Sequence, residues 1–276
     1  MRAVLDRLDE RLREGLIKPT GRAGKGISAV LTVLAFVLLM MTRTLNLIAD
    51  AQMSVRVATA VCLAFPLAVM LVFALRSEKS LLGTWGLCAL CAAAMLARVS
   101  FIERSAGDYE YYLADWLQKL SAGSFADGMR QNIGEYNVLY QYILFIITRL
   151  PVPPLYAVKA VSFIGDAFLA GAAASLAEKD GKPSMAAFGA MLLLPTVVLN
   201  GGMFAQCDSL YAACALWGLA LALREKPARA AVCFALSLAF KLQAVFMLPM
   251  VIVLWADKKL RLSDALVFVL TLALTA

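Results

Sequence analysis

The stretch Val57-Ala-Thr-Ala-Val-Cys-Leu-Ala-Phe-Pro-Leu-Ala-Val-Met-Leu-Val-Phe-Ala-Leu75 contains no charged residue. A helix of about 20 apolar residues is long enough to cross the ~30 Å hydrocarbon core of a bilayer. The stretch therefore predicts a transmembrane helix. Pro66 does not argue against this, because neighbouring helices can satisfy the backbone groups that a proline frees in a membrane helix.

Apolar runs of similar character flank this stretch on both sides. Hydrophobic residues make up 62% of the chain and charged residues only 16%. This pattern predicts an all-α, polytopic transmembrane protein with about eight to ten spans, some of them completed by tilt or by flanking polar residues. The other runs are 27–41, 81–97, 156–177, 185–199, 210–223, 228–240, 245–256 and 265–276.

The net charge of +7 lies largely in short segments between the apolar runs. Cationic loops of this kind set membrane orientation, so they indicate contact with membrane lipids and exclude a nucleic-acid partner. Residues 1–26 form a charged N-terminal segment, expected on the cytoplasmic side, in which Leu5, Leu8, Leu12 and Leu16 repeat at helical spacing. Such a helix either lies on anionic lipid or is a solvated tail.

A basic N-terminus and three spans in 27–100 place residues 101–137 on the extracytoplasmic side. Within this long polar loop, Tyr109, Tyr112, Leu113, Trp116, Leu117 and Leu120 follow a helical period. We therefore expect an amphipathic helix that lies in the membrane interface. Residues 138–276 are expected to form a transmembrane module that is incomplete, because the chain ends inside an apolar run.

Three charged loops, 178–182, 224–229 and 257–261, are separated by pairs of apolar segments and should share one side of the membrane. If that side is cytoplasmic, the polar stretches 206–208 and 241–243 face outward together with Asp108. This topology requires that residues 138–150 do not cross the bilayer.

The chain has no histidine, so His-based acid–base chemistry and most transition-metal sites are excluded. Cys88 and Cys91 have the spacing of a redox or zinc motif, but they lie inside an apolar run. We interpret them as small hydrophobic residues. Any proton transfer must then use carboxylates, Lys, Tyr, Cys or water.

Asp108 stands where the amphipathic helix begins, and two interpretations are open. The residue is either an N-cap, which typically contributes ~1 kcal/mol, or a catalytic carboxylate at the membrane surface. Lys159 and Asp166 lie seven residues apart, nearly two helical turns, so they share one face of a span. We interpret them as a structural polar pair that joins helices.

Gln206 and Asp208 follow an apolar run and the Asn200-Gly-Gly202 sequence, which allows an irregular loop. Lys241 and Gln243 interrupt the next pair of apolar segments. A cation and an amide at this depth suit a phosphate group, since Lys is a common phosphate partner. An ion pair between Lys241 and Asp208 is the simpler alternative, and the two interpretations are compatible.

Several of these stretches, in this order, resemble one family of membrane enzymes. The segments Gly107–Trp116, Ile133–Tyr142, the Lys159/Asp166 pair, Leu194–Asn200, Gln206–Ser209 and Phe240–Ala244 together resemble the GT-C glycosyltransferases. The similarity is greatest to a bacterial mannosyltransferase-related branch akin to the second GPI-anchor mannosyltransferase. The lipid-linked-glucose transferases of N-glycan assembly are also similar.

This resemblance implies an enzyme of a bacterial inner membrane with its active site on the extracytoplasmic side. The donor would be a polyprenyl-phosphate-linked sugar, the acceptor a glycan, lipid or protein, and transfer would invert the sugar. Asp108 would be the general base. Lys241, and more weakly Arg104, would stabilise the leaving phosphate, while Gln206, Asp208 and Gln243 would line the sugar or phosphate pocket. No cofactor and no metal ion would be needed.

Two other functions compete with this one. A transporter or lipid flippase needs a polar path through the midplane and usually has internal symmetry. The polar residues here gather at one surface instead, apart from Lys159 and Asp166. A non-catalytic membrane scaffold derived from the enzyme is the third possibility.

Overall fold

The computed structural model describes residues 2–42, 44–76, 80–130, 133 and 136–275. Within these ranges the chain is helical and contains no β-strand. The first half comprises α1 (Arg2–Ile17), α2 (Arg22–Thr42), η1 (Thr44–Ile48), α3 (Met53–Ala74), α4 (Leu81–Val99), η2 (Tyr109–Leu113), α5 (Ala114–Ser121), α6 (Phe125–Arg130) and α7 (Val138–Ile147). The second half comprises α8 (Pro154–Leu176), α9 (Met185–Leu193), α10 (Pro195–Gly202), α11 (Asp208–Leu223), α12 (Pro227–Phe240), η3 (Leu242–Met247), α13 (Leu248–Ala256) and α14 (Asp264–Thr275).

Four helices, α2, α3, α4 and α8, are long and apolar enough to cross a bilayer by themselves. The helices α9 and α10 meet at an angle of 51° at Leu194 and Pro195. Together they form a fifth span if the bent pair is counted as one. The expectation of an all-α polytopic membrane protein is therefore confirmed. The number of self-sufficient spans is below the expected eight to ten, because the runs after α8 form shorter helices.

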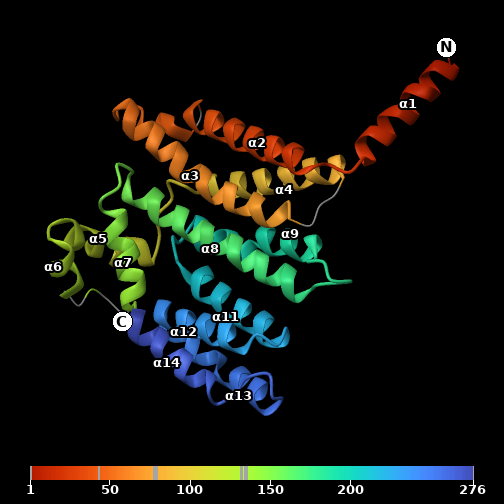
Figure 1. Ribbon diagram of the computed structural model, residues 1–276. Helices are drawn as coiled ribbons and strands as arrows, with labels where there is room; N and C mark the ends of the chain where they lie inside the picture. Colours follow the sequence, from red (N-terminus) through yellow and green to blue (C-terminus); the bar gives the residue numbers. More distant parts are fainter. Residues whose placement is uncertain (1, 43, 77–79, 131–132, 134–135, 276) are drawn as a thin grey trace.

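The long helices run side by side across Figure 1, and α5, α6 and α7 gather at one end of them. We call this the α7 end. The turns after α8, α11 and α13, which carry the charged loops, lie at the opposite end, which we call the loop end. Helix α7 is short and lies crosswise to the long helices, so residues 138–147 do not continue the bundle.

Helix α8 lies at the centre of the packing, between α3 and α11. Most of its side chains are buried, and glycines allow its neighbours to approach closely. A Cβ atom on Gly171 would lie 2.8 Å from the Phe73 ring, and one on Gly165 would lie 3.1 Å from the Leu210 backbone nitrogen. Small residues at such contacts let membrane helices pack tightly.

The expected amphipathic helix is present as η2, a π-helical turn, followed directly by α5. Its apolar side chains Leu113, Trp116, Leu117 and Leu120 are all buried. The element packs on α7, so this face contacts protein. The predicted amphipathic helix is therefore present, with these four side chains covered by protein, and its place in the membrane interface stays a prediction, because periodicity shows which face is apolar and not what covers it.

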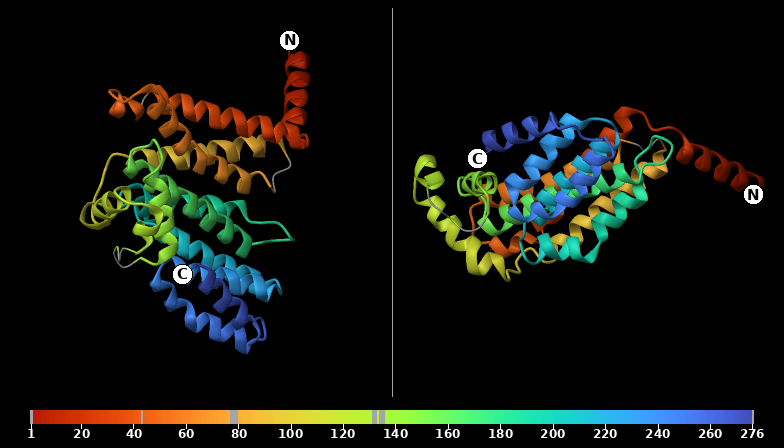
Figure 2. Two further views of the ribbon diagram at one scale, coloured as in Figure 1. Left: turned by 60° about the vertical axis from the view of Figure 1, so that its left-hand side comes forward. Right: turned by 90° about the horizontal axis from the view of Figure 1, so that it is seen from below.

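Helix α1 projects away from the other helices, as the right-hand view of Figure 2 shows. Its exposed residues include Arg7, Arg11 and Arg13. The side chains of Leu5, Leu8 and Leu12, on which the predicted apolar stripe depends, lie outside the part of the chain whose side chains are described. Whether α1 rests on lipid therefore stays a prediction.

Candidate active site

The segment between α10 and α11 positions two of the predicted residues, Gln206 and Asp208. Helix α10 ends at Gly202, and the chain then turns through Ala205, whose φ of 55° lies in the left-handed region. The Gln206 backbone N–H donates to the Asn200 carbonyl over 3.0 Å and so closes the turn. Asp208 then begins α11, where the positive end of the helix dipole favours a carboxylate.

Asp108 is half-buried and contacts this segment across the fold. The Gln206 Nε2 group donates a hydrogen bond of 2.7 Å to Asp108 Oδ2. Asp108 occupies the N-cap position of η2, but its side chain makes no capping hydrogen bond. The geometry thus disfavours the N-cap interpretation, since the carboxylate is directed to Gln206 instead of to the backbone of its own helix.

Lys241 pairs with Asp208, which is the simpler of the two interpretations given above. The residue follows the last turn of α12 in extended conformation, and its side chain is only 12% exposed. Its ammonium group forms an ion pair with Asp208 Oδ1 and lies 4.8 Å from the centre of the Tyr136 ring. A cation over an aromatic face is an attractive contact that strengthens as water is excluded.

Tyr136 lies at the Lys241–Asp208 pair, where its hydroxyl oxygen accepts from the Lys241 ammonium over 3.4 Å. Burial raises the pKa of its phenol, and nearby Cys207 and the carboxylates of Asp208 and Asp108 raise it further. The neighbouring Asn137 side chain donates to the Leu238 carbonyl over 2.5 Å, which fixes this loop to the end of α12.

Lys159 and Asp166 bond to different partners, so the predicted pair is two separate contacts. The Lys159 Nζ group donates to the carbonyls of Phe101, Ile102 and Arg104 over 2.7, 3.0 and 2.5 Å. These residues lead into the segment that carries Asp108. Two helical turns of spacing put the side chains on one face of α8, but at different depths, where different neighbours reach them.

Asp166 is completely buried and forms an ion pair with the equally buried Arg98 over 2.8 Å. Its other oxygen accepts a hydrogen bond from Ser209, the residue after Asp208. A Cβ atom on Gly201 would lie 3.5 Å from Asp166 Oδ2, so glycine lets α10 pass close to this group. Asp166 therefore joins α4, α8 and the start of α11.

Two predicted residues do not join this arrangement. Gln243 is exposed at the start of η3, and Arg104 has an exposed side chain although its carbonyl accepts from Lys159. For the residues that the structure describes, no hydrogen bond or ion pair links either side chain to Asp108, Gln206, Asp208 or Lys241.

Three contributors were not singled out from the sequence. Tyr136 lies within the stretch 133–142, which contributed to the family resemblance, but we assigned this residue no role of its own. Arg98, in the last turn of α4, resembled an ordinary end-of-span cation. Its signal was a charge of opposite sign inside a later apolar run, Asp166. Ser209 gave no signal, because serine is common at the start of helices.

The arrangement brings the Asp108 carboxylate and the Lys241 ammonium group to the same end of the helices. Asp108 can accept a proton, and the ammonium of Lys241 can exchange its Asp208 partner for a phosphate. Among the described residues, no group of three or more Cys, Asp or Glu side chains converges as a metal site would require.

Comparison with protein families gives one match. Residues 137–257 match the model of the alpha-(1→6)-mannopyranosyltransferase N-terminal domain family, which supports a glycosyltransferase related to mannosyltransferases. The matched range contains Gln206, Asp208 and Lys241 but excludes Asp108. No curated protein and no solved structure matches the chain.

Proposed function

We propose that this integral membrane protein transfers a mannosyl or related hexosyl group from a polyprenyl-phosphate donor to an extracytoplasmic acceptor, with inversion at the sugar. The acceptor is a glycan, lipid or protein hydroxyl. The family match to residues 137–257 supports sugar transfer. The convergence of Asp108, Gln206, Asp208 and Lys241 at one end of the helices supports a site at the membrane surface.

Asp108 is the general base in this proposal. The observation that carries it is the hydrogen bond from Gln206 Nε2 to Asp108 Oδ2, which orients the carboxylate away from its own helix. The other oxygen can then take the proton of the acceptor hydroxyl as that oxygen attacks the sugar. The chain has no histidine to take this role, and a carboxylate is one of the groups that remain.

Lys241 stabilises the leaving lipid phosphate. As the bond from sugar to phosphate breaks, negative charge develops on the phosphate oxygens, and a preformed cation lowers the barrier. Asp208 holds the ammonium in place before the donor arrives, and the Tyr136 ring supports it from one face. This cation fills the role of a metal ion at the phosphate, so the proposed reaction needs neither metal nor cofactor.

The remaining predicted residues have lesser roles in the proposal. Gln206 and Asp208 border the sugar and phosphate between the base and the cation. Gln243 and Arg104 are exposed at the edge of the site, and in this proposal they contact the donor once it is bound.

A transfer assay in membranes tests the function. Membranes that contain the protein are supplied with polyprenyl-phosphate mannose labelled in the sugar, and with nucleotide-linked mannose in a parallel reaction. We expect label in an acceptor product from the lipid-linked donor alone, with the anomeric configuration inverted. Labelled donor that crosses the bilayer unchanged would favour a flippase, and label that stays in the donor on its original side would favour a scaffold. Either result contradicts the proposal.

A further inference from the structure

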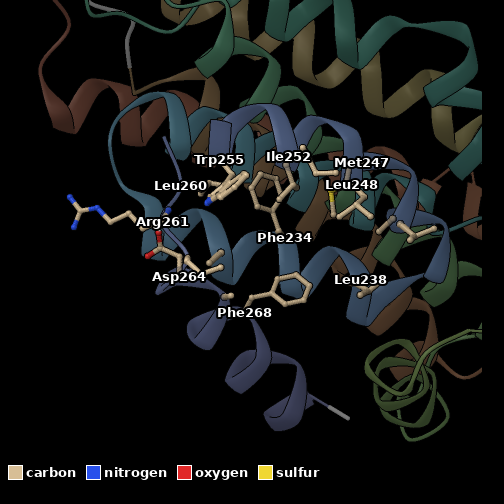
Figure 3. Close-up of a pocket in the computed structure, with 16 residues that line it drawn as sticks. Phe234, Leu238, Met247, Leu248, Ile252, Trp255, Leu260, Arg261, Asp264 and Phe268 are labelled. Atoms are coloured by element: carbon tan, nitrogen blue, oxygen red, sulfur yellow. Dashed lines mark hydrogen bonds between the residues drawn. The ribbon is translucent and has the colours of Figure 1, made fainter. Parts of the chain in front are cut away.

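A hollow lies between α12, η3, α13 and α14 and extends from the residues beside Lys241 to the 257–264 loop. It has a volume of about 480 Å³, within the ~300–1,000 Å³ range of ligand sites. Figure 3 shows Phe234, Leu238, Met247, Ile252, Trp255 and Phe268 around it. We call it the α13 cleft. None of Asp108, Gln206, Asp208 or Lys241 lines it.

The walls of the α13 cleft are apolar over nearly their whole length. Phe234, Leu254 and Leu260 belong to a small hydrophobic cluster behind it, separate from the main core. Water in such a hollow would find few hydrogen-bonding partners. A hydrocarbon chain fits this chemistry.

One end of the α13 cleft is cationic. Trp255, Leu260 and Arg261 also line an adjoining hollow of about 550 Å³, which Lys258 borders. Figure 3 shows the Arg261 side chain extending away from the apolar walls. Both cationic side chains are exposed. Two further charged groups lie nearby: Lys259 pairs with Glu225, and the Asp264 carboxylate, which also lines the cleft, accepts from the Arg261 backbone N–H and leaves one negative charge beside the two cations.

We propose that this site holds an anionic phospholipid of the surrounding membrane. One acyl chain lies in the α13 cleft, and the phosphate contacts Lys258 and Arg261. Trp255 lies between them, at the depth where tryptophan is enriched in membrane proteins. Basic residues at a membrane surface each favour anionic lipid by roughly fivefold in affinity.

The position of the cations argues against the sugar donor as the occupant. Helix α13 runs from Leu248, near the Lys241 side of η3, to Ala256, beside the 257–261 loop. Lys258 and Arg261 therefore lie at the loop end, whereas Lys241 lies at the α7 end. A donor whose phosphate contacts Lys241 could lay its hydrocarbon chain in the α13 cleft from the α7 end, but it would leave Lys258 and Arg261 without a phosphate, whereas a phospholipid entering from the loop end uses both the cleft and the cations.

Native mass spectrometry of the detergent-purified protein tests the proposal, with phosphatidylglycerol and phosphatidylcholine of identical acyl chains as probes. The wild type should bind phosphatidylglycerol more tightly. The double variant Lys258→Gln/Arg261→Gln should lose about 30-fold of this preference. The matched control Lys179→Gln/Lys182→Gln removes two exposed cations from another charged loop and should keep the preference.

A cleft-filling variant tests the acyl-chain position. Ala265 lines the cleft and is exposed, so Ala265→Phe adds volume there without displacing a buried side chain. This variant should bind both lipids more weakly while keeping its melting temperature. Equal affinity of the wild type for the two lipids, an unchanged preference in the Lys258/Arg261 variant, or an equal loss in the control would overturn the proposal. Displacement of phosphatidylglycerol by an equal concentration of a polyprenyl phosphate would also overturn it, in favour of the donor lipid.

Discussion

Lys241 ends an apolar helix, and its ammonium group contacts the Asp208 carboxylate and the Tyr136 ring. A lysine at this depth would cost about 2.5–3.5 kcal/mol on insertion scales if it faced lipid alone. Its partners offset that cost at the α7 end. The same contacts make Lys241 ready to receive an anion, because a phosphate can replace the carboxylate without new desolvation of the cation.

Replacing Lys241 by methionine should weaken donor binding and leave the protein folded. A charge-assisted hydrogen bond is worth about 1.5–3 kcal/mol, so the dissociation constant for polyprenyl-phosphate mannose should rise roughly 10- to 150-fold. The measurement is a binding titration without acceptor. The control is Lys119→Met, because Lys119 is 53% exposed and pairs with Asp115 on its own helix. An unchanged affinity for Lys241→Met would remove Lys241 from the phosphate role.

At the scale of residues, the sequence predicted most of the candidate site residues but few of the contacts between them. Asp108 and Gln206 were both candidates because polar groups beside apolar runs require a reason. Their hydrogen bond joins positions 98 residues apart, and no local pattern encodes such a distance. Gln243 was a candidate because an amide beside Lys241 suits a phosphate, and the irregular turn of η3 leaves it exposed.

At the scale of elements, α8 holds both halves of the site. Lys159 binds three carbonyls of the segment before Asp108, and Asp166 binds Ser209 beside Asp208. One rigid helix thus fixes the separation between base and cation. The sequence showed the shared face of these two residues, but the partners Arg98 and Ser209 follow from packing of helices that are distant in sequence.

Replacing Lys159 by methionine should therefore loosen the 101–104 segment. The carbonyls of Phe101, Ile102 and Arg104 lose the ammonium as a donor, although Phe101 still accepts from the Arg104 backbone N–H. The Ile102 carbonyl is the buried one, and leaving a buried group unpaired costs about 1–3 kcal/mol. The melting temperature should fall, and the segment near Arg104 should become accessible to trypsin. Ser162→Ala is the control, because it removes a hydroxyl that donates to the Val158 carbonyl of the same helix. If Lys159→Met melts and resists trypsin like the control, the positioning role is wrong.

The η2–α5 element shows where pattern reasoning ends. Helical periodicity predicted the segment and its apolar face, and the structure contains both. The face packs on α7 because that short helix lies crosswise at the same end. Periodicity describes one element, whereas the covering surface belongs to another.

At the scale of the whole molecule, the two ends of the helices differ in chemistry. The α7 end carries the site, and the loop end carries the charged turns after α8, α11 and α13. Excess lysine and arginine in short loops indicates the cytoplasmic side, so the α7 end should face outward. The all-α membrane class was predictable from the lengths of the apolar runs. The lengths of the helices after α8 were not, because they depend on where the backbone helix is interrupted within each run.

Thiol labelling in intact cells tests this orientation. A cysteine that replaces Ser124, an exposed residue of the 101–137 loop, should react with a membrane-impermeant maleimide. A cysteine that replaces Lys182, exposed at the loop end, should react only after lysis. The opposite pattern, or labelling of both only after lysis, would invalidate the extracytoplasmic placement of the site.

The central claim is that Asp108 acts as the general base, and the turnover of Asp108→Asn tests it most directly. Asparagine keeps an oxygen that can accept the Gln206 hydrogen bond, but it cannot take a proton. General-base catalysis typically contributes 10²–10⁴-fold, so kcat should fall by about that factor while donor affinity stays within a few-fold of the wild type. Asp115→Asn, which neutralises an exposed carboxylate of α5, should keep wild-type turnover. Near-wild-type kcat in a well-folded Asp108→Asn protein would contradict the account.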